Sequence, residues 1–204
     1  MQGNTLNVAI VILAAGASSR LGYPKQLVTL DGKSLLSRLI DEVSPFDKDM
    51  YLITGAFHRE FKNVAGNTIS IVQNQDWEDG MGSSIAKAVE HLKQDYDGII
   101  LTLSDQPFIS AQIFKDILST ISADKNKIIK SKYSEGSGPP VYFPSKYFPL
   151  LSTLSGDQGA SQIIKDHLDQ IIEIDFPKGH LDIDTLEQIN HLRKEYGIHL
   201  EIPL

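Results

Sequence analysis

The chain has 204 residues, of which 41% are hydrophobic and 22% charged, and its formal net charge is −7 at pH 7. These values are typical of a water-soluble globular protein whose core needs no covalent staples. The negative charge argues against a nucleic-acid partner, because such partners are normally bound by a basic surface. The absence of cysteine excludes disulfides, thiolate metal sites and a cysteine nucleophile.

The chain gives no sign of a leader, a membrane anchor or a second domain. Its amino-terminal residues lack the basic region of a secretory signal, and the apolar run at residues 8–15 is too short to span a membrane. Internal repeats, low-complexity tracts and long linkers are absent. We therefore expect a single domain over residues 1–204, located in the cytoplasm and without a membrane partner.

Five short apolar runs predict strands. The first, at residues 8–13, is almost continuous, which is typical of a parallel strand buried on both faces. The others are bounded by polar or glycine-rich stretches, and they lie at residues 50–54, 68–72, 98–103 and 170–174.

Helical patterns separate these strands. Apolar residues recur at helical spacing over residues 35–43, 85–92 and 113–121. A last helix, at residues 186–196, follows Asp184 and Thr185, either of which can cap it. Strands that alternate with helices predict an α/β fold, a three-layer αβα domain with a mostly parallel, Rossmann-like sheet.

One region breaks this alternation. Residues 132–149 contain two glycines and four prolines among tyrosines and phenylalanines. Because proline and glycine interrupt regular elements, we expect a loop-rich insertion beside the functional site, around residues 132–160.

The segment after the first predicted strand combines small residues with two cations. Ala14, Ala15 and Gly16 follow Leu13. Because these residues are small, backbone N–H groups can approach an anion closely. Arg20 and Lys25 add charge that can neutralise a triphosphate. Neither GxxxxGK[ST] nor GxGxxG occurs, so two common phosphate loops are excluded. Taken alone, the segment is also compatible with an alternative in which its glycines only form turns and its two cations are exposed to solvent.

Several motifs together resemble a known superfamily. The pattern Leu13-Ala14-Ala15-Gly16 followed by Arg20, Gly22 and Lys25 resembles the GT-A-like nucleotidyltransferases, which join a nucleotide to a phosphate-bearing acceptor. The similarity continues through GMGSS at residues 80–84, DQP at 105–107, GDQGA at 156–160 and DIDT at 182–185. Within the superfamily this ordered set is most similar to the MobA/MocA-like molybdenum cofactor cytidylyltransferases, and it spans nearly the whole chain.

The resemblance implies a substrate pair. Alanine at position 15 is common in cytidylyltransferases, whereas guanylyltransferase relatives usually carry glycine there, so CTP is favoured over other nucleoside triphosphates. Molybdopterin is then the favoured phosphorylated acceptor, and a molybdoenzyme is a possible downstream partner. The in-line transfer would release pyrophosphate and would use Lys25, Arg20 and Asp105.

Two aspartates are expected to hold Mg²⁺. Asp105 follows a predicted buried strand, and α/β sheets bind ligands at the carboxyl ends of their strands. Mg²⁺ takes few protein carboxylates and completes its shell with water and phosphate oxygens. By resemblance Asp184 is the second ligand, with Asp182 nearby, although Asp184 also fits a helix cap.

The segment around residue 80 is expected to meet the nucleobase. Gly80 and Gly82 free the backbone to approach a flat ligand, and Ser83 can cap the next helix. Related enzymes use this region against the base, and Asn74 offers an amide with both a donor and an acceptor. A glycine-rich helix start without a ligand is the alternative.

Two further segments are expected to hold the acceptor. One contains Gly138 and Pro140, and the other has Gly156 and Asp157 before a helix that we expect to start near residue 158. The chain departs from the family pattern at three positions, where Pro139 replaces histidine, Ser161 replaces arginine and Leu186 replaces proline. A sugar-phosphate or other small-phosphate nucleotidyltransferase and a non-catalytic nucleotide- or cofactor-binding accessory protein therefore remain as alternatives.

Overall fold

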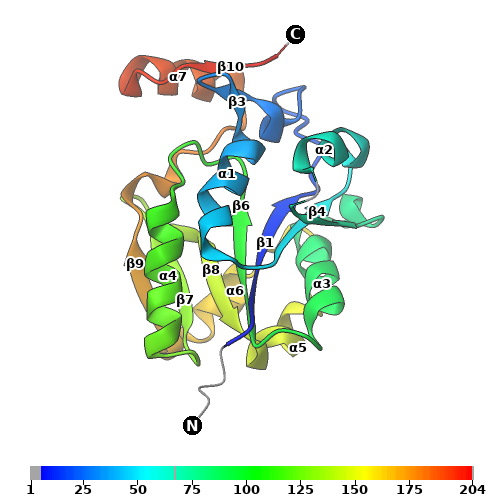
Figure 1. The fold of residues 1–204 in the computed structure, drawn as a ribbon, viewed down its shortest axis with the longest axis vertical. Coiled ribbons are helices and arrows are strands. Elements are labelled where there is room, and N and C mark those ends of the chain that lie inside the picture. The colour runs from blue at the N-terminus through cyan, green and yellow to red at the C-terminus, as the bar shows by residue number, and fades with distance from the viewer. Residues whose placement is uncertain (1–5, 67, 204) are drawn as a thin grey trace.

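The computed structural model describes residues 6–66 and 68–203, and Figure 1 shows their arrangement. Residues 1–5, on which the expectation of no leader partly depends, lie outside the described residues. Seven strands form a central sheet in the order β5-β4-β1-β6-β8-β7-β9. Their bounds are β1 Val8–Ala14, β4 Met50–Thr54, β5 Ser70–Gln73, β6 Gly98–Leu103, β7 Ile128–Lys132, β8 Ser137–Pro144 and β9 Ile171–Asp175.

The sheet is mostly parallel, as the alternation of strands and helices predicts. β1 pairs in parallel with β4 and β6, β4 with β5, and β7 with β9. Among the seven described strands β8 alone is reversed, because it pairs antiparallel with both β6 and β7. The α/β fold class is thereby confirmed.

Helices cover both faces of this sheet. Apolar side chains of α1 (Leu35–Val43), α2 (His58–Ala65) and α4 (Ala111–Ala123) share one buried cluster with the sheet. Those of α3 (Met81–Leu92), α5 (Phe148–Leu151) and α6 (Ser161–Lys165) share a cluster on the opposite face. Single 3₁₀ turns complete the structure at Lys25–Leu27, Ser44–Phe46, Trp77–Asp79, Ser145–Tyr147, Leu168–Gln170 and Pro177–His180.

A small lobe lies beyond the carboxyl ends of the parallel strands (Figure 1). It consists of α7 (Leu186–Tyr196) and a three-stranded sheet of β10 (Leu200–Glu201), β2 (Thr29–Leu30) and β3 (Lys33–Ser34). Its own apolar cluster joins residues from both ends of the chain, including Leu21, Val28, Ile183 and Leu200. The lobe therefore ties the segment after β1 to the carboxyl-terminal segment.

The prediction of a loop-rich insertion around residues 132–160 is wrong for the first part of that range, because residues 137–144 form β8 inside the central sheet. The β7–β8 register shifts between Lys130 and Ser131, so Pro139 and Pro140 lie in the irregular part of the ladder. Their missing N–H groups are tolerated at such a bulge. Tyr142 and Phe143 are fully buried core residues.

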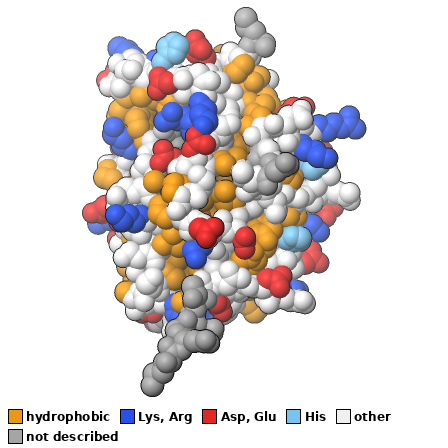
Figure 2. All heavy atoms as spheres, viewed as in Figure 1, with side chains coloured by type: hydrophobic (Ala, Val, Ile, Leu, Met, Phe, Trp, Pro, Cys, Tyr) orange, Lys and Arg blue, Asp and Glu red, His pale blue; other side chains and the backbone are white. Residues whose placement is uncertain are grey.

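The surface on the face drawn in Figure 2 mixes acidic and basic side chains with short apolar strips. Among the described residues no helix is both long and apolar enough to cross a membrane.

Gly80 and Gly82 allow the start of α3 to pack tightly against residues 155–157. A Cβ added to Gly80 would lie 2.4 Å from the carbonyl carbon of Gly156, and one added to Gly82 would lie 2.6 Å from the amide nitrogen of Ser155. The N–H of Gly82 also donates to the carbonyl of Gly156 at 2.9 Å. Both glycines therefore serve a backbone contact within the protein.

Replacing Gly80 with alanine should lower the free energy of unfolding by about 2 kcal/mol or more, because it adds a steric clash to an unfavourable positive φ. Gly32→Ala is the matched control, since Gly32 also has a positive φ but no atom within 4 Å of its added Cβ. That control should cost about 1 kcal/mol. Urea unfolding measures both, and equal losses would contradict the packing explanation.

Candidate active site

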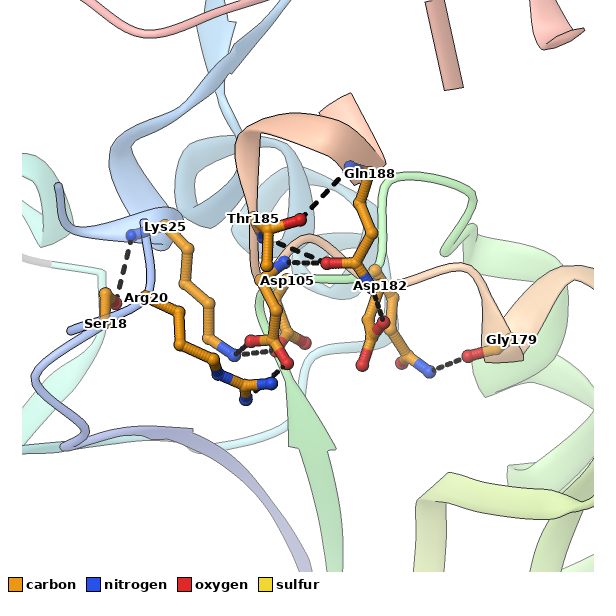
Figure 3. Close-up of polar contacts among 10 residues, drawn as sticks. Ser18, Arg20, Lys25, Asp105, Gly179, Asp182, Thr185 and Gln188 are labelled. Carbon is orange, nitrogen blue, oxygen red and sulfur yellow. Dashed lines mark hydrogen bonds and ion pairs between the residues drawn. The ribbon is translucent and has the colours of Figure 1, made fainter. Parts of the chain in front are cut away.

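The segment between β1 and the turn at Lys25–Leu27 folds around Ser18. The Ser18 carbonyl accepts hydrogen bonds from the N–H groups of Leu21 at 3.1 Å and Gly22 at 3.0 Å. Its hydroxyl oxygen accepts one from the Lys25 N–H at 3.2 Å. This compact turn directs the side chains of Arg20 and Lys25 toward the same group of carboxylates (Figure 3).

Lys25 lies between two carboxylates from distant parts of the chain. Its ammonium pairs with Oδ2 of Asp105, directly after β6, and with Oδ1 of Asp184 at 2.8 Å. Arg20 donates to the other oxygen of Asp184 at 2.7 Å. Asp105 is buried, and its second oxygen, Oδ1, has no hydrogen-bond partner. The predicted cations and acidic residues therefore do come together at the carboxyl end of the sheet.

A backbone contact and a helix cap position Asp184. The N–H of Ile183 donates to the carbonyl of Asp105 at 3.0 Å, which holds the carboxyl-terminal segment beside β6. Thr185 caps α7, and the Gln188 side chain accepts from the N–H groups of Asp184 at 2.8 Å and Thr185 at 2.9 Å. Of the two expected capping residues Thr185 has this role, which leaves the Asp184 carboxylate free for Lys25 and Arg20.

Burial and neighbouring charges set the pKa values of this cluster. Burial tends to lower the pKa of Lys25, but the Asp105 and Asp184 carboxylates outweigh it and raise that pKa above its usual range. Burial tends to raise the pKa of Asp184, but Lys25 and Arg20 hold it below the usual value. The pKa of Asp182 is raised by burial and then by its neighbours Asp105 and Asp184. These neighbours thus favour the charged forms of Lys25 and Asp184 and disfavour the charged form of Asp182.

A cavity of about 440 Å³ opens over this cluster. Its lining contains nine of the predicted site residues, namely Leu13, Ala14, Ala15, Gly16, Arg20, Lys25, Gly80, Asp105 and Asp157. A second cavity, of about 510 Å³, shares Leu13, Met81 and Leu103 with the first and contains the predicted Gly138. Its lining is largely apolar.

Other predicted site residues do not line these cavities. Asn74 is buried, and its amide donates to the hydroxyls of Ser83 at 2.9 Å and Ser84 at 3.1 Å, so it secures the start of α3. Ser83 in turn donates to the carbonyl of Gly80 at 2.8 Å, and no side chain caps α3. The local polar groups thus satisfy one another instead of facing a base.

The four residues expected to hold the acceptor are divided, because Gly138 lines the second cavity and Asp157 the first, whereas Pro140 and Gly156 line neither. Pro140 is buried in β8, and Gly156 packs on Gly80 instead of lining either cavity. The helix expected near residue 158 begins only at Ser161 and has five residues. Its start is therefore displaced from Gly156 and Asp157, which belong to the preceding turn.

Sequence reasoning missed several residues of the first cavity, among them Gln26, Trp77, Glu78, Met81 and Ser104. Trp77 is the single tryptophan of the chain, and this was the one available signal. Gly55 makes room for it, since an added Cβ would lie 2.5 Å both from the Trp77 Cβ and from the Ala15 carbonyl oxygen. The first loop and the Trp77 turn therefore pack on a common glycine.

Comparison with known proteins identifies the family. The model of the MobA-like NTP transferase domain matches residues 10–171. The chain belongs to this family. Among curated proteins it is 29% identical to the purine catabolism protein PucB of Bacillus subtilis, over 90% of this chain and 95% of PucB. It is 30% identical to nicotine blue oxidoreductase of Paenarthrobacter nicotinovorans, over 89% and 94% of the two chains.

Solved structures agree with this family of nucleotidyltransferases. Rv0371c of Mycobacterium tuberculosis superposes with a TM-score of 0.80 at 27% identity, over 92% of this chain and 97% of Rv0371c. A structure of Rv0371c in complex with manganese gives a TM-score of 0.77 at 24% identity, covering 93% and 99% of the chains. The MobA-like domain described here thus has the fold of its relatives along nearly its whole length.

Replacing Asp182 with asparagine should change how stability depends on pH. Because the folded-state pKa of Asp182 is raised above 3.8, the folded protein binds more protons than the unfolded chain in the interval between the two pKa values. Asp182 by itself therefore makes wild type lose stability as pH rises through that interval, and the variant lacks this contribution.

Above the interval Asp182→Asn should be more stable by some tenths of a kcal/mol, since solvent screens this half-buried group. An asparagine oxygen can still accept the hydrogen bond that Gln188 donates to Asp182 at 3.2 Å. Urea unfolding between pH 3.5 and 7 measures the difference in the free energy of unfolding between wild type and Asp182→Asn. A variant that is less stable than wild type at pH 7 would contradict the expected sign.

Proposed function

We propose that this nucleotidyltransferase transfers the cytidylyl group of CTP to the phosphate of molybdopterin in a reaction that depends on Mg²⁺. The observation that carries the proposal is the Lys25 ammonium held between Asp105 and Asp184, beside a cavity that Lys25 and Asp105 line. The cavity adjoins a second, apolar one, so two substrates can meet at the charged cluster.

The first cavity suits a nucleoside triphosphate. Small residues of the first loop line this cavity, and Lys25 and Arg20, which also line it, contribute positive charge. Phosphate oxygens would compete for these cations with Asp184, which now holds both of them. CTP is proposed over GTP from the alanine at position 15, as the family pattern implies.

The acidic residues fit a divalent cation. Asp105 and Asp184 already converge on one positive group, and Oδ1 of Asp105 is buried without a partner. Within residues 6–66 and 68–203 no group of three or more His, Cys, Asp or Glu is arranged to hold a metal. A cation on two carboxylates, completed by water and phosphate oxygens, is the manner in which Mg²⁺ binds, and Mn²⁺ favours the same oxygen ligands. When bound, it would neutralise charge on the phosphates.

The chemical step needs neither a covalent intermediate nor a general base. An oxygen of the acceptor phosphate, already ionised at neutral pH, attacks the α-phosphorus of CTP, and the bond from that phosphorus to the pyrophosphate oxygen breaks. The bonding electrons leave with pyrophosphate. Lys25 and Arg20 would stabilise the negative charge that moves onto the leaving group, while the first loop holds the reactants in line.

The second cavity favours a ring system as the body of the acceptor. Pro139, Phe143 and Ile164 are among its apolar lining residues. A sugar would leave most of its hydroxyls without partners on such walls. Molybdopterin, which carries a fused ring and a phosphate, is therefore proposed over a sugar phosphate, with a molybdoenzyme as the partner that receives the product.

A turnover assay tests this proposal. The purified protein is incubated with each nucleoside triphosphate and Mg²⁺, first with molybdopterin and then with a panel of sugar phosphates, and pyrophosphate release is measured. We expect release with CTP and molybdopterin. Turnover with a sugar phosphate alone would overturn the acceptor, and no turnover with any pair would favour the accessory-protein alternative.

Lys25→Met should reduce turnover about 10²–10³-fold, because it removes a cation from the developing charge. It should also lower the free energy of unfolding by about 3 kcal/mol, since it leaves the buried Asp105 carboxylate without its counter-charge. Added Mg²⁺ should restore part of that stability by binding the folded state.

Lys87→Met is the control, because Lys87 is a half-exposed lysine whose one ion pair within the described residues is with Glu90, at 3.5 Å. It should leave turnover unchanged and cost well under about 1 kcal/mol of stability. Pyrophosphate release and urea unfolding measure both variants. Wild-type turnover in a folded Lys25→Met protein would show that the proposed site is wrong.

A further inference from the structure

Gln26 lines the nucleotide cavity but has no role in the site described so far. It lies in the 3₁₀ turn Lys25–Leu27, immediately after the lysine that joins the two carboxylates. The residue is 3% exposed, and its side-chain oxygen Oε1 is buried without a hydrogen-bond partner. A buried polar atom in this state destabilises the protein unless something else satisfies it.

No contact within the described protein accounts for an amide at this position. The next two residues, Leu27 and Val28, pack into apolar clusters, and no hydrogen bond of the Gln26 side chain is found among the described residues. What distinguishes position 26 is its place in the wall of the cavity. An unpartnered amide oxygen in the wall of a ligand cavity is expected to find its partner in the ligand.

Two other residues that line the cavity share this property. The hydroxyl of Ser104 and the Oδ1 atom of Asp105 are also buried and unpartnered, and both residues line the same cavity. An amide oxygen and a carboxylate oxygen both accept hydrogen bonds, and a hydroxyl can do so as well. Each of these three atoms can therefore accept a hydrogen bond from a donor group of a ligand.

We infer that Gln26 is a ligand-binding residue, whose amide oxygen accepts a hydrogen bond from an O–H group of the bound nucleotide complex. This inference rests on the proposed nucleotide site and deepens it. Two sources offer that chemistry, a ribose hydroxyl and a water molecule held by the divalent cation, because Mg²⁺ usually keeps several of its waters. The Ser104 hydroxyl can accept a hydrogen bond in the same cavity, and Asp105 is left for the cation.

A substitution that keeps the size of the side chain separates this role from a structural one. In Gln26→Met the unpartnered oxygen is lost, so the unliganded protein should become more stable, with a Tm about 2–4 °C higher. The same variant should bind CTP with Mg²⁺ about tenfold more weakly. A residue needed only for folding would give the opposite sign in the first measurement.

Gln106→Met is the matched control. Gln106 is as buried as Gln26 and its Oε1 is also unpartnered, but its amide nitrogen donates to the carbonyl of Gly179 at 2.6 Å and to the Tyr133 hydroxyl at 3.0 Å. Removing these bonds should lower Tm. The two glutamine variants should therefore move stability in opposite directions.

Thermal unfolding without ligand and titration calorimetry with CTP and Mg²⁺ give the two readouts. If wild type binds and Gln26→Met binds equally well, this inference is overturned while the proposed function stands. If wild type binds neither CTP nor another triphosphate, the nucleotide site itself is wrong and the inference falls with it. A lower Tm for Gln26→Met without loss of affinity would show a structural residue.

The source of the O–H group is assigned with 2′,3′-dideoxy-CTP. If the ribose supplies the donor, wild type and Gln26→Met should bind this analogue with equal affinity. If water on the cation supplies it, the roughly tenfold difference should persist. Each result supports an O–H donor at Gln26, whereas equal binding of both CTP and the analogue by the two proteins overturns it.

Discussion

The organisation of this domain depends on the ion pairs that Lys25 makes with Asp105 and Asp184. They join three segments that are remote in sequence, namely the loop after β1, the end of β6 and the entry to α7. Such a cluster is costly to bury unless its charges are balanced, and here two cations oppose the carboxylates. The result is a charged cluster in which Lys25 pairs with both carboxylates and Arg20 with one of them.

Two different kinds of packing hold the cluster in place. On the sheet side, β1 and β6 are adjacent parallel strands, so the residues that follow them emerge next to each other. On the other side, the small lobe fastens α7 and β10 to the hairpin of β2 and β3, and the cap made by Thr185 and Gln188 fixes the backbone at Asp184. The sheet therefore determines where Asp105 lies, and the lobe determines where Asp184 meets it.

Much of the fold could be predicted because its signals are local. The strands at residues 50–54 and 98–103 and the helices at 35–43 and 186–196 have the predicted bounds, since continuous apolar runs and helical spacing identify them directly. β8 was missed because its prolines suggest a loop, and only the register shift opposite Ser131 explains how a strand accommodates them. The two-residue strands of the small lobe leave no periodic pattern at all.

The candidate site, like the fold, could be predicted from the sequence only in part. Lys25, Asp105 and Asp184 were expected from strand ends and from resemblance, and they do lie together. Asn74, Gly82 and Gly156 have residue types suited to ligand binding, yet each is used in contacts within the protein. Sequence shows which chemical groups are available, but whether a donor is already satisfied depends on tertiary contacts. Gln26 is the reverse case, an inconspicuous residue whose lack of partners appears only in three dimensions.

The pairing of β10 with β2 has a consequence for synthesis of the protein. Leu200 lies opposite Leu30, and the Asp31 N–H donates to the carbonyl of His199 at 3.0 Å, so the lobe needs residues from both ends of the chain. A nascent chain that has not reached residue 184 can pair β1 with β6 but has no Asp184 to oppose Arg20. Until residues 183–201 have been made, the apolar side chains of residues 21–35 that they cover stay exposed, which favours aggregation.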